Sequence, residues 1–207
     1  MSYQIGLAAH DLSCRRGGRK LFEGLSYALK PGEALLVTGP NGAGKTSLLR
    51  LNVGLLPLED GSFRVTGAPS DTPLPELCHY VGHANGIKTS LSVRENLAFY
   101  ADYLGGNGAG VADALAAFKL DELADFPAGM LSAGQKRKLA LSRLFTSSRP
   151  IWLLDEPSVS LDAVSIKQLD AALGRHLKAG GVAIVASHVA PKTKFARRLA
   201  LGLELVS

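Results

Sequence analysis

The amino-acid sequence predicts an α/β fold: a core sheet with an antiparallel β edge and an inserted helical subdomain. Three observations carry this prediction. A glycine-rich loop follows the apolar run 34–37, a second apolar run at 151–154 ends in two carboxylates, and residues 84–145 have a helical pattern. Uninterrupted apolar runs are typical of strands covered on both faces. Because 207 residues with 46% hydrophobic content can fill a sizeable core, we expect one domain over residues 1–207.

The first 83 residues predict short strands of the core and of its β edge. Residues 5–30 alternate between apolar and polar positions on either side of a turn at Gly17-Gly18. Further short strands are expected over residues 62–66 and 78–81. Glycine, proline and acidic residues separate these runs, as is usual for turns.

The stretch from Gly39 to Thr46 matches the pattern G-x-x-x-x-G-K-[ST] at every specified position. Its glycines let backbone N–H groups converge on phosphate oxygens, and the positive end of the following helix faces the same anion. We expect Lys45 to reach the β- and γ-phosphates and the Thr46 hydroxyl to ligate Mg²⁺. A plain turn would need neither side chain. The predicted nucleotide-binding residues are Gly39, Pro40, Asn41, Gly42, Ala43, Gly44, Lys45, Thr46 and Ser47.

Helices replace strands between residues 84 and 145. Ser92 and Glu95 match a capping box that begins a helix through Tyr103, and residues 111–118 predict another helix. We therefore expect a helical subdomain over residues 84–145. The nucleotide-binding core with its β edge would then comprise residues 1–83 and 146–207.

The segment Leu131-Ser132-Ala133-Gly134-Gln135 precedes a helix expected over residues 136–145. Ser132 and Gln135 match a capping box, which by itself accounts for these two residues. It does not account for Gly134, because a cap needs no glycine there. A close approach of the backbone to an anion does need one.

Asp155 and Glu156 follow the apolar run 151–154, at the carboxyl end of a buried strand. Doubly wound sheets bind their ligands at that edge. We expect Asp155 to hold Mg²⁺, directly or through water, and Glu156 to orient and deprotonate an attacking water. An acidic pair that ends a strand is usually a solvated loop. A complete phosphate loop upstream favours the metal and general-base interpretation.

The remaining sequence predicts further core elements. Asp162 is expected to cap a helix over residues 163–178. A buried strand is expected over residues 182–187, and the tail from 198 to 206 can pair as a last strand.

Composition limits the partners. The formal net charge of +5 includes basic clusters within 15–20, 136–138 and 192–198, each expected to be a solvated face. Because aromatic residues are only 6% of the chain, nucleic-acid binding is not expected. Cys14 and Cys78 are expected to be ordinary buried thiols. We expect neither a secretory signal nor a membrane span, which needs about 20 apolar residues.

The order of motifs resembles the ATP-binding subunit of an ABC transporter: phosphate loop, Leu131–Gln135, Asp155-Glu156, Ser160-Leu161-Asp162 and His188. The resemblance implies a P-loop NTPase core of the ABC ATPase type, with ATP and Mg²⁺ as cofactors. It implies that two chains sandwich two ATP molecules, with the ATP of each copy contacted by the other copy's Ser132, Gly134, Gln135 and Asp162. It also implies that His188 contacts the γ-phosphate, which gives Glu156, His188 and Lys45 as catalytic residues.

Two positions depart from that family. His83 stands where a glutamine is usual, and we expect it near water or Mg²⁺ although its charge varies near neutral pH. Arg16 stands where an aromatic residue usually stacks on adenine. A planar guanidinium can also stack on a base.

Residues 80–83, 86–88 and 95–100, together with the short tail, narrow the resemblance to the ATP-binding subunit of the cytochrome c maturation transporter, a haem exporter. This implies membrane subunits B and C as partners, ATP hydrolysis tied to haem delivery, and a peripheral location on the cytoplasmic face of the inner membrane. The ATPase of another ABC exporter is an alternative. A small P-loop kinase would not explain residues 131–135, and a soluble ABC-type ATPase usually has a coiled-coil insertion or a second cassette.

Overall fold

The computed structural model describes residues 3–106, 110–188 and 192–202, and within them the strands form two sheets. Five parallel strands lie in the order β5 (Cys78–Val81), β6 (Ile151–Asp155), β7 (Val182–Ala186), β3 (Ala34–Thr38) and β8 (Arg197–Ala200). Three antiparallel strands lie in the order β2 (Arg19–Leu29), β1 (Gly6–Arg16) and β4 (Asp60–Thr66). The predicted α/β fold is confirmed, and its antiparallel strands form a sheet of their own.

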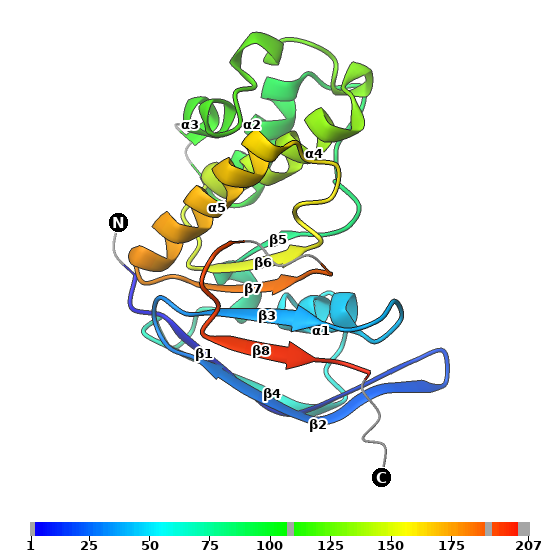
Figure 1. The fold of residues 1–207 in the computed structure, drawn as a ribbon. Helices are drawn as coiled ribbons and strands as arrows, with labels where there is room; N and C mark the ends of the chain where they lie inside the picture. The colour runs from blue at the N-terminus through cyan, green and yellow to red at the C-terminus, as the bar shows by residue number, and fades with distance from the viewer. Residues whose placement is uncertain (1–2, 107–109, 189–191, 203–207) are drawn as a thin grey trace.

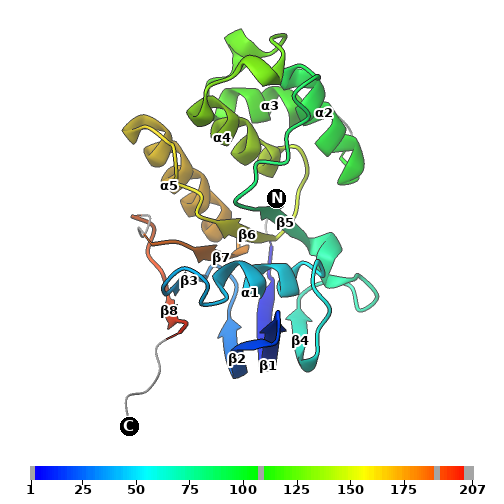
Figure 2. The same ribbon diagram turned by 90° about the vertical axis from the view of Figure 1, so that its right-hand side faces the viewer.

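Helices cover the parallel sheet on both faces. Figure 1 shows α2 (Val93–Tyr103), α3 (Gly110–Ala117) and α4 (Ala133–Ser142) grouped above the sheets, with α5 (Ala163–Lys178) running beside them. Figure 2 shows α1 (Lys45–Asn52) between the parallel and the antiparallel sheet. Short 3-10 helices occupy residues 74–77, 121–123, 128–130 and 143–145. The division of the chain at residues 84 and 145 stays a prediction.

Caps set the helix starts. Ser92 accepts a 3.1 Å hydrogen bond from the backbone N–H of Glu95, whose carboxylate accepts a 2.7 Å bond from the backbone N–H of Ser92. This capping box begins α2 as predicted. Asp162 is the N-cap residue of α5, as expected, because its side chain accepts a hydrogen bond from the backbone N–H of Ser165. The helix expected over residues 136–145 begins earlier, at Ala133, because Ser132 is its cap, and its last three residues form a 3-10 turn.

Two hydrophobic cores share the parallel sheet. Successive side chains of a strand point to opposite faces. One face packs against α2 to α5, with Leu36, Trp152, Leu154 and Val185 among its buried residues. The other face packs against α1 and the antiparallel sheet, with Leu35, Val37, Leu153 and Ile184 among its buried residues. Covering on both faces explains the uninterrupted apolar runs in the sequence.

The last described strand, β8, pairs in parallel with β3 at the edge of the sheet. It spans residues 197–200 and so includes 198–200 of the strand expected over 198–206; residues 201 and 202 are not in a strand, and residues 203–206 lie outside the described residues. Cys14 and Cys78 are buried free thiols, as predicted. Among the described helices, none combines the length and the apolar character needed to cross a membrane.

Candidate nucleotide-hydrolysis site

The phosphate loop joins β3 to α1. Gly44 is the N-cap residue of α1 and has a φ of 102°, which disfavours any residue with a side chain. At Gly39, whose φ is 138°, a Cβ atom would lie 2.3 Å from the backbone oxygen of Leu201. A glycine N-cap supplies no side-chain acceptor, so the first N–H groups of α1 are left for a ligand.

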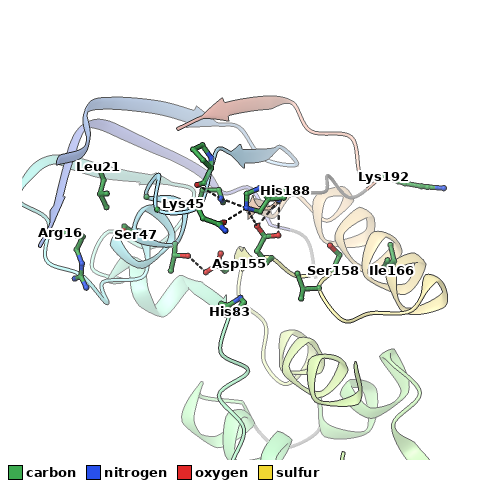
Figure 3. Close-up of a pocket in the computed structure, with 17 residues that line it drawn as sticks. Arg16, Leu21, Lys45, Ser47, His83, Asp155, Ser158, Ile166, His188 and Lys192 are labelled. Atoms are coloured by element: carbon green, nitrogen blue, oxygen red, sulfur yellow. Dashed lines mark hydrogen bonds and ion pairs between the residues drawn. The ribbon is translucent and has the colours of Figure 1, made fainter. Parts of the chain in front are cut away.

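Lys45 lies across the loop that precedes it. Its Nζ atom donates to the backbone oxygens of Gly39, at 2.7 Å, and Pro40, at 3.2 Å. The same atom lies 3.1 Å from Nε2 of His188, which in turn lies 2.9 Å from Oδ1 of Asn41. The side chains of Lys45 and His188 therefore meet over the phosphate loop (Figure 3).

Thr46 and Asp155 come together from two different strand ends. Thr46 is in the first turn of α1, after β3, and Asp155 is the last residue of β6. The Thr46 hydroxyl donates a 2.8 Å hydrogen bond to Oδ2 of Asp155, which is only 2% exposed. The carboxyl edge of a parallel sheet brings such residues together, as the sequence predicted.

Glu156 is held by the loop that follows β7. Its backbone N–H donates to Ala186, and its carboxylate accepts bonds from the hydroxyl of Ser187, at 3.0 Å, and the backbone N–H of His188, at 3.2 and 3.3 Å. One carboxylate oxygen lies 3.7 Å from Nε2 of His188. With a φ of 46°, Glu156 adopts a left-handed backbone conformation that is unfavourable for a residue with a side chain.

These residues line a cavity of about 950 Å³ (Figure 3). Arg16 and Leu21 lie on one side, Ile166 and Lys192 on the other, and His83 on the wall below Asp155. The predicted residues that line it are Arg16, Pro40, Asn41, Gly42, Gly44, Lys45, Thr46, Ser47, His83, Asp155, Glu156 and His188. Gly39 and Ala43 belong to the same loop but are not among the residues that line the cavity.

The cavity also contains residues that the sequence analysis missed: Leu21, Ser158, Val159, Ile166 and Lys192. Ser158 and Val159 follow Glu156 closely, so their nearness to the carboxylates was a usable signal. Leu21 lies in β2, next to the hairpin turn, and its place against the phosphate loop depends on how the two sheets pack. Ile166 and Lys192 carry no motif, and only the fold brings them to the cavity.

The segment from Ser132 to Gln135 does not line the cavity of its own chain. Ser132 accepts a 3.2 Å bond from the N–H of Gln135, whose side chain accepts a 2.8 Å bond from the N–H of Ser132. At Gly134 a Cβ atom would lie 2.8 Å from the backbone oxygen of Ser160. A close contact within the chain therefore accounts for the glycine, which the sequence analysis explained only by an anion.

Asp162 lies outside the cavity as well. Its carboxylate accepts 2.7 Å bonds from the N–H and the hydroxyl of Ser165 and a 3.0 Å bond from Lys138. These bonds hold the pKa of Asp162 well below its usual range, and the bond from the backbone N–H of Ser165 has the largest effect.

Arg137 corrects one expectation. The basic cluster at 136–138 is not a solvated face, because Arg137 is 4% exposed and its guanidinium donates to backbone oxygens of the Asp155–Pro157 turn. Burial lowers the pKa of Arg137 to about 10, so it stays charged at neutral pH. The helical period could have predicted that Arg137 is buried, because Ala140, Leu141 and Leu144 follow it at helical spacing and lie on the same buried side of the helix.

Comparison with known families agrees with this geometry. The family model described as ABC transporter matches residues 22–159, which include the phosphate loop and both carboxylates. The chain therefore belongs to the ABC transporter family. A putative ABC transporter ATP-binding protein from Pyrococcus furiosus has the same fold, with a TM-score of 0.79, 23% identity and coverage of 95% of this chain and 97% of that one.

The curated relatives are much more similar. The cytochrome c biogenesis ATP-binding export protein CcmA of Nitrobacter winogradskyi is 48% identical over 196 residues, covering 95% of this chain and 98% of the relative. The protein of the same name from Chelativorans sp. is 45% identical over 197 residues, with the same coverage. The chain thus belongs to the family of these export proteins. Its enzymatic activity is ATP hydrolysis of the ABC transporter type.

Proposed function

We propose that this ATPase powers haem export or delivery in the biogenesis of c-type cytochromes. The observation that carries the proposal is that one cavity brings together Lys45, Thr46, Asp155, Glu156 and His188. The near full-length relatives of the chain are named for cytochrome c biogenesis. The ATPase of a different ABC exporter is the second candidate, since the same cavity would serve it.

The nucleotide is held mainly by its phosphates. Residues of the phosphate loop and of the first turn of α1 line the cavity, so their N–H groups are available to phosphate oxygens, and Lys45 supplies a positive charge there. Binding of a γ-phosphate would replace the contacts that Lys45 now makes with Gly39, Pro40 and His188. Arg16 and Leu21, at one side of the cavity, are the residues available to the base.

Mg²⁺ fits the oxygen atoms at the bottom of the site. The hydroxyl of Thr46 and the carboxylate of Asp155 already lie within 2.8 Å of each other, and Mg²⁺ prefers oxygen ligands. The described residues contain no cluster of three or more His, Cys, Asp or Glu side chains that could hold a metal. Phosphate oxygens and water would therefore complete the coordination. The ion would neutralise charge on the phosphates, and His83 on the cavity wall would contact it through water.

Glu156 is the general base in this proposal. Its carboxylate is fixed by the Ser187 hydroxyl and the His188 N–H, so it can accept a proton from a water aligned with the γ-phosphate. The His188 ring lies between Lys45 and Glu156, where it can donate a hydrogen bond to the γ-phosphate. Both groups act at the end of the cavity nearest the phosphate loop.

A second copy of the chain completes the site. Ser132, Gly134, Gln135 and Asp162 stand outside the cavity of their own chain, which favours their contact with the ATP of a partner in a head-to-tail dimer. Val159 and Val164, on either side of Asp162, are 47% and 59% exposed and would be covered in such a dimer. Membrane subunits B and C of the cytochrome c maturation system are the further partners. This places the chain at the cytoplasmic face of the inner membrane, as a peripheral subunit.

Glu156→Gln tests the mechanism. The amide keeps the shape of the side chain and cannot accept the proton, so we expect turnover to fall about 10²- to 10⁴-fold while ATP binding and ATP-dependent dimerisation persist. Phosphate release and size-exclusion chromatography with ATP measure the two effects. Glu122→Gln, at an exposed position, is the control. Normal turnover of Glu156→Gln would rule out the general-base role.

The transported species needs a separate experiment. Affinity capture of the chain from gently solubilised native membranes, followed by mass spectrometry, identifies the membrane subunits that come with it. Recovery of the cytochrome c maturation subunits supports haem delivery. Recovery of another permease leaves the ATPase chemistry in place and removes the haem assignment.

A further inference from the structure

Arg137 binds the turn that carries the catalytic carboxylates. Its Nη2 atom donates to the backbone oxygens of Asp155, at 2.7 Å, and Glu156, at 2.9 Å. Its Nε atom donates to the backbone oxygen of Pro157, at 3.3 Å. One guanidinium therefore binds three consecutive carbonyl groups at the end of β6.

The other end of the same guanidinium holds the loop after β5. Its Nη1 atom donates to the backbone oxygen of Gly82, at 2.8 Å, and to Oδ1 of Asn85, at 3.1 Å. His83, which lines the cavity, lies between these two acceptors in the chain. Arg137 thus connects both walls of the cavity that face the proposed Mg²⁺ position.

We propose that Arg137 is a positioning residue for ATP hydrolysis, which fixes the backbone of Glu156 relative to the loop 82–85 and to α4. The proposal rests on the proposed function of the site and adds a residue to it. Arg137 touches no reacting atom. It acts through the carbonyl groups that it binds.

The backbone of Glu156 gives a physical reason for this role. A left-handed conformation such as its φ of 46° is unfavourable for a residue with a side chain and persists only where the surroundings fix it. Bonds from a charged donor to Asp155 and Glu156 stabilise that turn. A planar guanidinium can bind two segments at once, whereas a lysine ammonium is a single point donor.

Its place on α4 gives Arg137 a second connection. The cap of α4 is Ser132, in the segment that would face the partner's ATP, and Arg137 lies little more than one turn further along the same helix. A helix transmits a displacement as a rigid body. Movement of Ser132 toward a second copy would therefore shift the group that holds the Glu156 turn.

Arg137→Lys tests the proposal, with Arg143→Lys as the matched control. Arg143 is also buried and binds the backbone of Asn85, in the same loop as Arg137 does, but its guanidinium lies over the ring of Tyr100, 3.9 Å from the ring centre. It therefore shares the contact with the loop but, unlike Arg137, its hydrogen bond is not to the carbonyl groups of the Glu156 turn. For Arg137→Lys we expect kcat to fall about 10- to 100-fold, as for a small displacement of a catalytic group. The KM for ATP should stay within about threefold, since phosphate contacts are intact. Arg143→Lys should keep kcat within about threefold.

Folding is measured in parallel by circular dichroism and thermal unfolding. If Arg137→Lys does not fold, Asn85→Ala replaces it, because this change removes one acceptor of Nη1 and leaves Gly82 bound. We expect kcat of Asn85→Ala to fall about threefold or more at unchanged KM.

An unchanged kcat in a folded Arg137→Lys protein, or a rise of KM with kcat unchanged, would overturn the proposal. So would an equal loss of kcat in Arg143→Lys. These outcomes leave the general-base assignment untouched, because that assignment fails only if Glu156→Gln retains turnover.

Discussion

The Thr46 hydroxyl donates a 2.8 Å hydrogen bond to the Asp155 carboxylate, and this bond joins the first turn of α1 to the end of β6. One strand, β7, lies between β3 and β6 in the sheet order, so the bond crosses the carboxyl edge of the sheet, where we propose that the nucleotide binds. Both oxygen atoms are of the kind that Mg²⁺ prefers as ligands. A cation at this position would bind both of them in place of the hydrogen bond.

Thr46→Val should therefore raise the Mg²⁺ concentration needed for half-maximal turnover about tenfold or more. Valine keeps the branched shape and removes only the hydroxyl. Thr46→Ser, which keeps the hydroxyl, should stay within about threefold. Turnover and binding of a fluorescent ATP analogue, each measured against Mg²⁺ at constant nucleotide, check this. Equal Mg²⁺ dependence in all three proteins would remove Thr46 from the metal site.

Lys45→Ala should weaken ATP binding about 10- to 100-fold, the effect of losing one charged hydrogen bond. Isothermal titration with ATP measures the affinity. Lys178→Ala, at an exposed position near the end of α5, is the control and should bind ATP as the parent does. Parent-like affinity of Lys45→Ala would mean that the loop amides alone hold the phosphates.

Gly134→Ala and Gly174→Ala form a matched pair of helical substitutions. At Gly174, in α5, an added Cβ meets nothing within 4 Å, so alanine should raise the free energy of unfolding by about 0.5–1 kcal/mol. At Gly134 the Cβ would lie 2.8 Å from the Ser160 oxygen, and displacement of α4 should lower the free energy of unfolding by about 1–3 kcal/mol. Urea unfolding distinguishes the two. A stabilising Gly134→Ala would show that the Ser160 segment yields easily.

Two buried histidines should make the chain sensitive to acid. Burial lowers the pKa of His79 to about 3 and that of His176 to about 4. Nε2 of His79 is 2.9 Å from the Ser147 oxygen, and its buried Nδ1 has no partner among the described residues. The His176 ring stacks on Trp152 at 4.1 Å. Protonation of either ring in place is therefore unfavourable.

The unfolded chain binds protons at these histidines near pH 6.5, whereas the folded chain does not until about pH 4. Stability is thus complete above pH 6.5 and falls as the pH drops from 6.5 toward 4. When the pH drops from 7 to 5.5, the two histidines together should lower the free energy of unfolding by about 2 kcal/mol. Denaturant unfolding at several pH values checks this.

His176→Gln should reduce the acid sensitivity by about half, because one of the two groups no longer titrates. His10→Gln is the control, since His10 is exposed and paired with Asp11. If His10→Gln changed the pH dependence as much as His176→Gln, the buried rings would not be its source.

The sequence predicted what local rules decide. The strand over residues 78–81, the helix that starts after Ser92 and the helix capped by Asp162 follow from short apolar runs and caps. The phosphate loop, Asp155 and Glu156 were also predicted, because a motif and a strand end define them. Their places in the structure agree with those motifs, while their chemical roles remain proposals.

Tertiary packing decides what the sequence could not predict. Leu21 reaches the cavity because the antiparallel sheet packs under α1, and Ile166 because α5 runs past the carboxyl edge of β6. Arg137 stands between two lysines that resemble a solvated run, although its own guanidinium is buried. Gly134 is required in the structure by its close contact with Ser160, which its motif did not indicate; the approach to an anion, which the motif did indicate, stays a prediction.

The sharing of one sheet by two cores sets a limit on how this chain can change in length. In β6, Ile151 and Leu153 face α1 while Trp152 and Leu154 face α5. Insertion of one residue within this strand would exchange these partners on both sides at once and would also rotate Asp155 away from Thr46. Length variation should therefore be confined to turns such as residues 67–73, and β3, β6 and β7 should accept substitutions but no insertions.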